Sequence, residues 1–365
     1  MELKAWVRKL EELGLSYRLL GEKERILVLE RGARVLAISA ESDEVRTDGS
    51  PKSELRELSP FWGDPSELET GGWNSGGDRT WIGPEEPLFS RGVPTQLDPG
   101  SCRFTDRQSS RDSVVVEQEG TLQYDIGSSS MSFAFRLRKT ISVAVNPLKL
   151  ADHRFFHEWT EIPYAGYTSR TELTLPNIEA IPGVDVVASP ACSLWSILQV
   201  PMGGAALVQQ LCGGEPQLMF GDGAGGLSAR HGAGCFIPYR GSRKFKLSFN
   251  ALQSAGRFGY VRQMDDRRYS LVVRQFRVDP SGLYPDYPPG RPDETGSCMQ
   301  FYFDGGQMGS FGELEYHAPA IRCRSGATAF DESQLWHYAG TERQISALTR
   351  VFLGMDLNAA LSLIT

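Results

Sequence analysis

Short runs in which hydrophobic and polar residues alternate recur along most of the chain, and they predict β-strands. Each run is rich in β-branched or aromatic residues and is bounded by turn formers, as expected for strands with one buried face. Residues 25–31 and 33–39 form two such runs around Arg31-Gly32, which predicts a hairpin. Further strands are predicted at residues 16–20, 114–118, 121–126, 131–145, 154–161, 194–200, 205–211, 235–238, 245–250, 259–264 and 269–278.

Helical periodicity is clear only at the two ends of the chain. Near the N-terminus, hydrophobic residues recur at the spacing of an amphipathic helix, namely Leu3, Trp6, Val7, Leu10 and Leu13. Near the C-terminus, Thr341 is a predicted N-cap and Gly354 a predicted stop. The apolar face between them consists of Ile345, Leu348, Val351 and Phe352. Residues 40–100, dense in Gly, Pro, Ser and Asp, predict a long irregular stretch of the kind that covers a fold or carries function.

The composition suits a chain of many short strands. Among its 365 residues are 39 glycines and 21 prolines, and no repeat of solenoid or propeller length is present. Since every alternating sheet has one apolar face to bury, two packed sheets are the expected solution. We therefore expect an all-β fold, a large two-sheet antiparallel β-sandwich. We expect the sandwich to form one domain over residues 1–365, with an N-terminal helix in residues 1–15 and a C-terminal helix in residues 341–365 that packs on the sandwich.

Charge and hydropathy argue against several classes of function. The net charge is −7 with both signs interspersed, so the clustered basic face that nucleic-acid binding requires is not predicted. No stretch approaches the roughly 20 apolar residues of a membrane span. The N-terminal residues 1–15 lack the apolar core of a signal peptide, so we expect a cytoplasmic protein, with a removed leader as the open alternative. Six cysteines without metal-site spacing leave disulfide pairing open, as the sequence leaves the oligomeric state.

The segment GGDRTWIGPE, residues 76–85, is the most informative candidate for a binding site. Two glycines let the backbone approach a ligand closely. Arg79 offers a planar fork of donors for two sugar oxygens, and Trp81 offers a flat face for the C–H side of a pyranose ring. Asp78 and Glu85 supply carboxylates nearby. The alternative is structural, with Arg79 paired to Asp78 or Glu85 and Trp81 in the core.

A second candidate lies in residues 311–319, FGELEYHAP. If this segment is a strand, Glu313, Glu315 and His317 point to one face while Leu314 and Tyr316 point to the other. The polar row then either meets solvent or lines a groove. A carboxylate beside an imidazole can move protons near neutral pH, so a catalytic role and an exposed polar face are both open.

A third candidate is the pair His153 and His157. The two share a face at strand or helix spacing, but no third ligand is fixed by local spacing, so no metal site is predicted. A histidine satisfied by a backbone carbonyl is the alternative. The glycines of residues 221–226 lack a nucleotide-binding frame, and no G-x-S-x-G elbow is present, which leaves nucleotide binding and serine hydrolysis unsupported.

At these motifs the chain resembles the galactose mutarotase-like superfamily, and more closely bacterial relatives of aldose 1-epimerases. GGDRTWIGPE resembles an early motif of that group, and IPYAGYTSRTELT with SLWSILQVP resembles its mid-chain strands. GELEYHAPAIRCRSGATAFDESQLWHYAG is similar to its late Glu-Leu-Glu strand and closing Trp strand. The resemblance covers roughly residues 70–340 and implies a supersandwich with a sugar-binding groove across one sheet.

The resemblance also implies roles for individual residues. Glu315 corresponds to the base that removes the anomeric hydroxyl proton, and Arg79 to an arginine that grips the sugar. The usual mid-chain histidine motif is not reproduced, so the acid that protonates the ring oxygen is either His157 or His317. Asp78, Trp81, Glu85 and Glu313 complete the expected substrate-binding set.

These observations lead to a hypothesis of function with two alternatives. The leading hypothesis is a carbohydrate-active enzyme of aldose 1-epimerase type, which transfers protons on a sugar or sugar derivative without an organic cofactor, while the sequence leaves the involvement of a metal open. The first alternative is a non-catalytic carbohydrate-binding protein. The second is a lyase or hydrolase acting on an oligosaccharide, with residues 60–100 forming one wall of an extended cleft.

Overall fold

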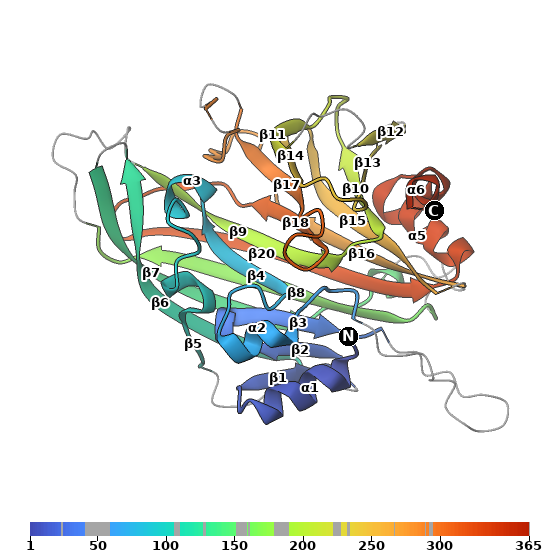
Figure 1. Cartoon of the computed structure of the whole chain (residues 1–365), viewed down its shortest axis with the longest axis horizontal. Coiled ribbons are helices and arrows are strands. Elements are labelled where there is room, and N and C mark those ends of the chain that lie inside the picture. The colour runs from blue at the N-terminus through green and yellow to red at the C-terminus, as the bar shows by residue number, and fades with distance from the viewer. Residues whose placement is uncertain are drawn as a thin grey trace.

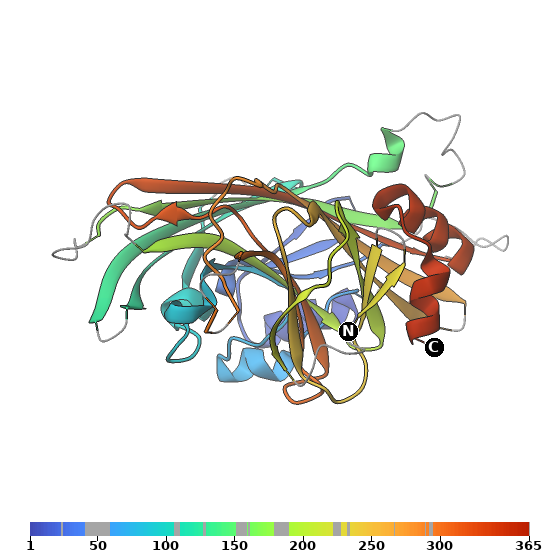
Figure 2. The ribbon, with the colours of Figure 1, turned by 90° about the horizontal axis from the view of Figure 1, so that it is seen from above.

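The fold consists of two large antiparallel β-sheets, shown in a computed structural model of the chain (Figure 1). The structure describes residues 1–22, 25–40, 59–105, 110–126, 129–150, 159, 161–178, 190–221, 228–231, 234–265, 267–288, 290–291 and 295–364. This arrangement confirms the predicted all-β, two-sheet antiparallel sandwich. Its layers are visible in Figure 2.

The first sheet, called sheet 1, has the order β1-β2-β3-β4-β9-β18-β17-β14-β11, with β19 added to β9. Its strands are β1 (Tyr17–Leu20), β2 (Ile26–Leu29), β3 (Arg34–Ile38), β4 (Asp78–Gly83), β9 (Ala191–Pro201), β11 (Gln217–Gly221), β14 (Phe245–Asn250), β17 (Ser297–Phe303), β18 (Phe311–His317) and β19 (Ile321–Arg322).

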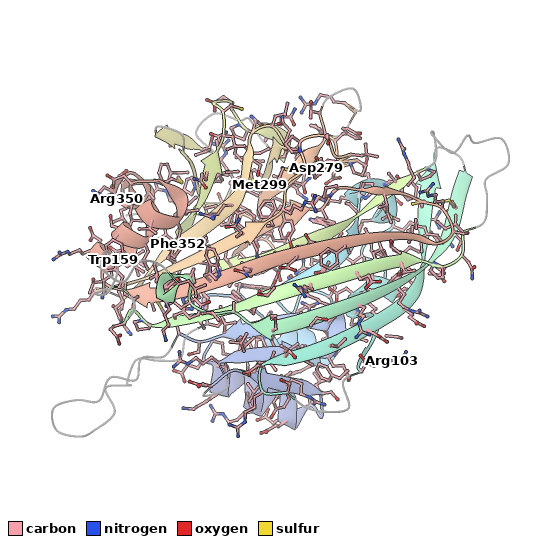
Figure 3. All side chains as sticks on the ribbon, turned by 180° about the vertical axis from the view of Figure 1, so that it is seen from behind. Arg103, Trp159, Asp279, Met299, Arg350 and Phe352 are labelled. Carbon is pink, nitrogen blue, oxygen red and sulfur yellow. The ribbon has the colours of Figure 1, made fainter. Side chains whose placement is uncertain are left out.

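The second sheet, called sheet 2, has the order β12-β13-β10-β15-β16-β20-β8-β7-β6-β5. Its strands are β5 (Ser101–Phe104), β6 (Ser113–Ile126), β7 (Ser129–Val143), β8 (Tyr164–Leu175), β10 (Gly204–Gln210), β12 (Ala229–His231), β13 (Gly234–Pro238), β15 (Ser254–Asp265), β16 (Arg268–Phe276) and β20 (Ala327–Gly340). Figure 3 shows the long strands of this sheet from behind.

The alternation that predicted strands also builds the core between the sheets. Leu314 and Tyr316 of β18 point inward, where they join a cluster of buried hydrophobic residues contributed by both sheets. Phe301 of β17 and Val272 of β16 lie in the same cluster. Side chains on alternate positions of these strands share one face, so the remaining positions of β17 and β18 point away from sheet 2.

Helices cover parts of the outer faces. Helix α1 (Leu3–Glu12) packs its buried side chains against the outer side of β2 and β3. Helices α5 (Glu342–Leu353) and α6 (Leu357–Ile364) pack against the outer side of sheet 2, so they lie far from α1 in Figure 1. The expected cap and stop of α5 are confirmed, since Thr341 forms a capping box and Gly354 adopts the left-handed conformation. Val351, expected on its apolar face, is instead 38% exposed.

The expectation of an irregular stretch over residues 40–100 is wrong for part of that stretch. Strand β4 lies in the middle of sheet 1, and the short helices α2 (Pro65–Thr70) and α3 (Glu85–Leu88) flank it. Strand β4 lacks the alternation of a half-exposed strand because both of its faces are buried. Residues 41–58 and most of the predicted strand 154–161 lie outside the described residues.

All six cysteines have free thiols. Among the described helices, none combines the length and apolar character that crossing a membrane would need.

A buried ion pair joins the two sheets across the core. Asp78 of β4 accepts from Arg274 of β16 at 2.7 Å, and both side chains are 1% exposed. Tyr167 of β8 donates a hydrogen bond to the same carboxylate, and Ser333 of β20 accepts from Arg274 at 3.1 Å. Burial of charge is unfavourable unless the charge is paired, so each partner depends on the other.

Removing one partner of this pair should be strongly destabilising. We expect Arg274→Ala to lower the free energy of unfolding by about 3–5 kcal/mol, because the Asp78 carboxylate then stays buried without its cation. Urea unfolding followed by circular dichroism measures this change. The matched control is Arg268→Ala, which breaks the partly exposed pair with Asp265 and should cost less than about 1 kcal/mol. Equal losses for the two variants would contradict the assignment.

Candidate functional site

The candidate site lies on the face of sheet 1 that points away from sheet 2. Strands β4, β9, β18, β17 and β14 are neighbours in that order. Their register places Arg79 beside Ile197, Glu315 beside Ile197 and Gln300, and Tyr302 beside Lys246. Polar side chains from distant parts of the sequence therefore meet on one surface.

A cavity of about 260 Å³ opens above this surface, and we call it the main cavity. Segments that flank β4 and β18 supply its walls, with Trp73 before β4, Phe89 and Val93 after it, and Met308 before β18. The strands contribute Arg79, Trp81, Trp195, Phe220, Lys246, Tyr302, Phe311 and Glu313, and the remaining lining residues are Glu85, Gly92 and Lys244. Part of the expected irregular stretch thus forms a wall of the cavity.

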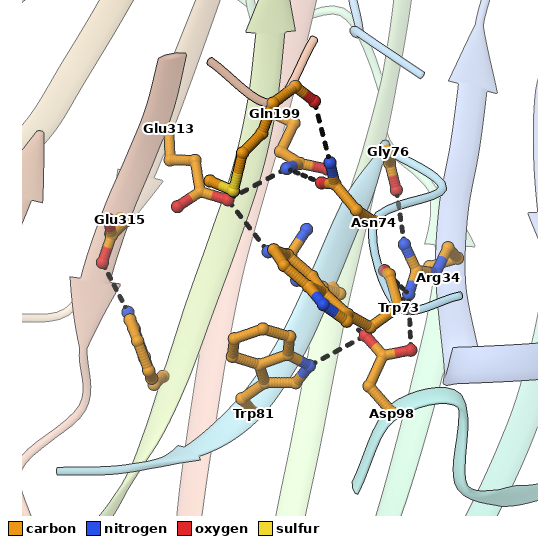
Figure 4. Close-up of polar contacts among 12 residues, drawn as sticks. Arg34, Trp73, Asn74, Gly76, Trp81, Asp98, Gln199, Glu313 and Glu315 are labelled. Atoms are coloured by element: carbon orange, nitrogen blue, oxygen red, sulfur yellow. Dashed lines mark hydrogen bonds and ion pairs between the residues drawn. The ribbon is translucent and has the colours of Figure 1, made fainter. Parts of the chain in front are cut away.

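Arg79 is held between aromatic rings and a carboxylate. Its guanidinium lies 4.3 Å from the ring centroid of Trp81 and 5.5 Å from that of Trp73. Its Nη2 donates to Glu313 Oε1 at 2.9 Å, and Gln199 Nε2 donates to the same oxygen at 3.0 Å. Figure 4 shows Glu313, Gln199 and Asn74, whose Oδ1 accepts from Gln199 Nε2 at 2.8 Å. Arg79 and Glu313 are therefore fixed in place before any ligand binds.

Asp98 fixes the orientation of the Trp81 indole, which lines the main cavity. It accepts from Trp81 Nε1 at 3.0 Å, and both of its oxygens accept from Arg34 Nη2 at 2.7 Å (Figure 4). Asp98 and Arg34 are nearly fully buried. A buried indole needs a partner for its N–H group, so Asp98 determines how Trp81 faces the cavity.

Lys246 links two carboxylates at the edge of the main cavity. Its Nζ lies 2.7 Å from Glu85 Oε2 and 3.0 Å from Glu315 Oε2. Trp195 Nε1 also donates to Glu315 Oε2, at 2.8 Å. Although burial acts in the other direction, Glu315 and Glu85 raise the pKa of Lys246 above its ordinary value. Lys246 therefore keeps its charge.

Glu315 has a strongly perturbed carboxyl group. Its side chain is fully buried, and burial raises the pKa of Glu315 to about 8 against the opposing attraction of Lys246. The nearby Glu313 and Glu85 carboxylates raise this pKa further. Glu315 consequently exists in both protonation states near neutral pH.

His317 lies on the same face of β18 but beneath the cavity. Its ring stacks on Trp195 with centroids 5.4 Å apart, and its Nε2 lies 3.4 Å from Asp286 Oδ2. Although burial opposes it, hydrogen bonds from His317 and Gln300 and the charge of Lys246 lower the pKa of Asp286 to about 2. His317 is fully buried and is not among the residues that line the main cavity.

Several buried polar atoms around the main cavity have no hydrogen-bond partner among the described residues. They belong to three side chains and are Arg79 Nε and Nη1, Tyr302 Oη and Glu315 Oε1. Leaving such buried atoms unpaired costs free energy.

The structure brings together most, but not all, of the residues singled out from the sequence. Arg79, Trp81, Glu85 and Glu313 line the main cavity, whereas Glu315 is fully buried, is not among the lining residues, and contacts the lining residue Lys246. Asp78 points to the opposite face of β4, where it pairs with Arg274, because successive residues of a strand alternate. His317 lies below the cavity, and His157 lies outside the described residues.

Sequence reasoning missed Lys246, Trp73, Trp195 and Tyr302. A signal for Lys246 exists in the strand FKLSFN, residues 245–250, where it sits between core residues Phe245 and Leu247 and must face the other way. Trp73 comes from a covering segment and carries no comparable signal. Within the described residues, no three His, Cys, Asp or Glu side chains gather in a group that could hold a metal ion.

The raised pKa of Glu315 should appear in the pH dependence of stability. The folded protein holds the Glu315 proton more tightly than the unfolded chain, so this group's contribution is complete below about pH 4.5 and is lost as the pH rises toward about 8. We expect wild type to lose stability relative to Glu315→Gln between these pH values. Urea unfolding of both proteins across pH 5–8 measures the difference, and a constant difference would contradict the raised pKa.

Comparison with known proteins gives matches in structure only. No family model and no curated protein matches the chain. In overall structure the chain is similar to YeaD from Salmonella typhimurium, a provisionally assigned mutarotase, with 10% identity over 91% of this chain and 99% of that one and a TM-score of 0.42. It is also similar to galactose 1-epimerase from Lactobacillus acidophilus, with 9% identity over 86% and 91% of the two chains and a TM-score of 0.32.

Proposed function

We propose that the main cavity binds a carbohydrate and that the protein is an acid/base enzyme of aldose 1-epimerase type. The observation that carries this proposal is a cavity walled by indole rings and floored by fixed, partly unpaired polar groups. Aromatic faces pack against the C–H side of a sugar ring, and the polar groups match its hydroxyls. The sequence resemblance to relatives of aldose 1-epimerases supports the same conclusion.

Arg79 and Glu313 serve as the hydroxyl-binding pair in this proposal. Arg79 Nη2 donates to Glu313 and Nε lies 4.0 Å from Asp98 Oδ2, while Nη1 has no hydrogen-bond partner among the described residues and is the donor left for a sugar oxygen. Glu313 can accept from a neighbouring hydroxyl. Because both side chains are fixed by their existing contacts, binding orders few additional groups.

Glu315 and Lys246 carry the proton transfer. Glu315 removes the proton of the anomeric hydroxyl, the bond between the anomeric carbon and the ring oxygen breaks, and Lys246 gives a proton to that oxygen. The product is the open-chain sugar, which recloses from either face by the reverse steps. A base with a pKa near the working pH is well suited to this task.

The contact between Glu315 and Lys246 returns both groups to their starting protonation states after each turnover. Protonation of Glu315 removes one of the two carboxylate charges that hold the proton on Lys246, so Lys246 becomes a stronger acid at the step that needs one. The proton can return across the 3.0 Å contact between Glu315 and Lys246. Lys246 thereby replaces the histidine acid that the resemblance implies.

A non-catalytic carbohydrate-binding protein is the second candidate. It is favoured by the position of the histidines, because neither His317 nor His337 lines the main cavity. The side chains of His153, His157 and His231 lie outside what the structure describes. In this candidate function the main cavity makes the same sugar contacts, but no proton transfer takes place.

We also propose that residues 1–365 form one domain. Strands from early and late parts of the chain alternate in both sheets, as in the neighbours β4, β9 and β18. Each sheet therefore contains strands from the N-terminal and the C-terminal part of the chain.

Glu315→Gln should abolish anomer exchange without abolishing sugar binding. The amide cannot take the anomeric proton, but it keeps the size and the hydrogen-bonding capacity of the side chain. Exchange NMR of purified protein with a panel of aldoses, ketoses and uronic acids measures turnover, and saturation transfer in the same samples measures binding.

Glu172→Gln is the matched control, since Glu172 is exposed on β8 in sheet 2. It should exchange and bind like wild type. Full exchange by Glu315→Gln would refute the catalytic proposal. Binding by wild type with exchange at the buffer rate would leave the carbohydrate-binding candidate.

A further inference from the structure

A second cavity, of about 330 Å³, adjoins the main cavity. It is lined by Glu85, Glu86, Phe89, Ser90, Met219, Phe220, Lys246, Asp286 and Tyr287. Four of these residues, Glu85, Phe89, Phe220 and Lys246, also line the main cavity. The two cavities are therefore lobes of one groove, with the ion pair between Lys246 and Glu85 where they meet.

Each lobe has the size of a single-ring site. Ligand pockets span roughly 300–1,000 Å³, so each lobe alone lies near the lower end of that range, whereas the two together lie well inside it. A free monosaccharide would fill only one of them.

The second lobe also has the wall chemistry of a sugar subsite. Phe89, Phe220 and Tyr287 supply ring faces, and Glu86 supplies an exposed carboxylate that can accept from hydroxyls. Asp286 is already engaged, since its oxygens accept from Glu85 N at 3.2 Å and from Gln300 at 2.5 Å. Asp286 therefore shapes the lobe by holding its neighbours.

We propose that the groove binds a sugar carrying a second ring, such as a disaccharide, with one ring in each lobe. This inference rests on the proposed carbohydrate function of the main cavity and names its substrate class. The ring with the free anomeric hydroxyl lies in the main cavity against Trp81 and Arg79, and the linkage through another carbon of that ring crosses near Glu85.

Affinities for disaccharides and their component monosaccharides test the inference. Calorimetry of the full chain with maltose, cellobiose and lactose, and with glucose and galactose, should show at least one disaccharide bound about ten-fold or more tighter than its components. Tyr287→Ala, which removes a ring of the second lobe, should reduce this ratio toward one. Phe330→Ala is the matched control, because Phe330 is 61% exposed on β20 in sheet 2, and it should leave the ratio unchanged.

The outcomes separate the two proposals. Binding of monosaccharides with the same affinity as disaccharides would overturn the second subsite and keep the carbohydrate function. An equal loss of affinity for both ligand lengths in Tyr287→Ala would also overturn it, since the lobe would then not act separately. Binding of no sugar of either length would overturn the proposed function itself.

Discussion

The structure depends on a constraint in the middle of sheet 1, where both faces of β4, β9 and β18 are covered. One face packs against sheet 2 and must be apolar or internally paired, while the other forms the floor of the groove. The two-residue period of a strand sorts the residues strictly between these surroundings. Consecutive residues therefore have unrelated roles, since Leu314 packs in the core between the sheets while Glu315 pairs with Lys246 on the other face.

Charge at the groove is arranged so that every buried ion has a fixed counterpart. Arg79 is balanced by Glu313, Arg34 by Asp98, and Lys246 by Glu85 and Glu315. Burial of the Glu315 carboxyl, with the Glu313 and Glu85 carboxylates nearby, raises its pKa against the attraction of Lys246, which explains why Glu315 departs so far from an ordinary glutamate.

The sequence predicted the elements whose signals are local and failed where burial overrides the pattern. Alternation identified the hairpin of β2 and β3, and capping chemistry identified the ends of α5. The two-residue alternation also placed Glu313 and Glu315 on one face of β18. Strand β4 was missed because a strand buried on both faces loses its alternation. Trp73 and Lys246 could not be assigned to the site, since their roles depend on contacts between segments more than 100 residues apart in several cases, such as Lys246 and Glu85.

The polar contacts between the sheets have a consequence for how the groove discriminates among ligands. Asp78, next to Arg79, is tied to Arg274, and Tyr316, next to Glu315, donates to Asp331 of β20 at 2.5 Å. Sliding one sheet over the other would break both contacts, so the floor of the groove keeps its shape when a ligand arrives. Under the proposed carbohydrate function, a rigid floor would select by stereochemistry, because a sugar epimer with one misdirected hydroxyl would meet a surface that does not adjust to it.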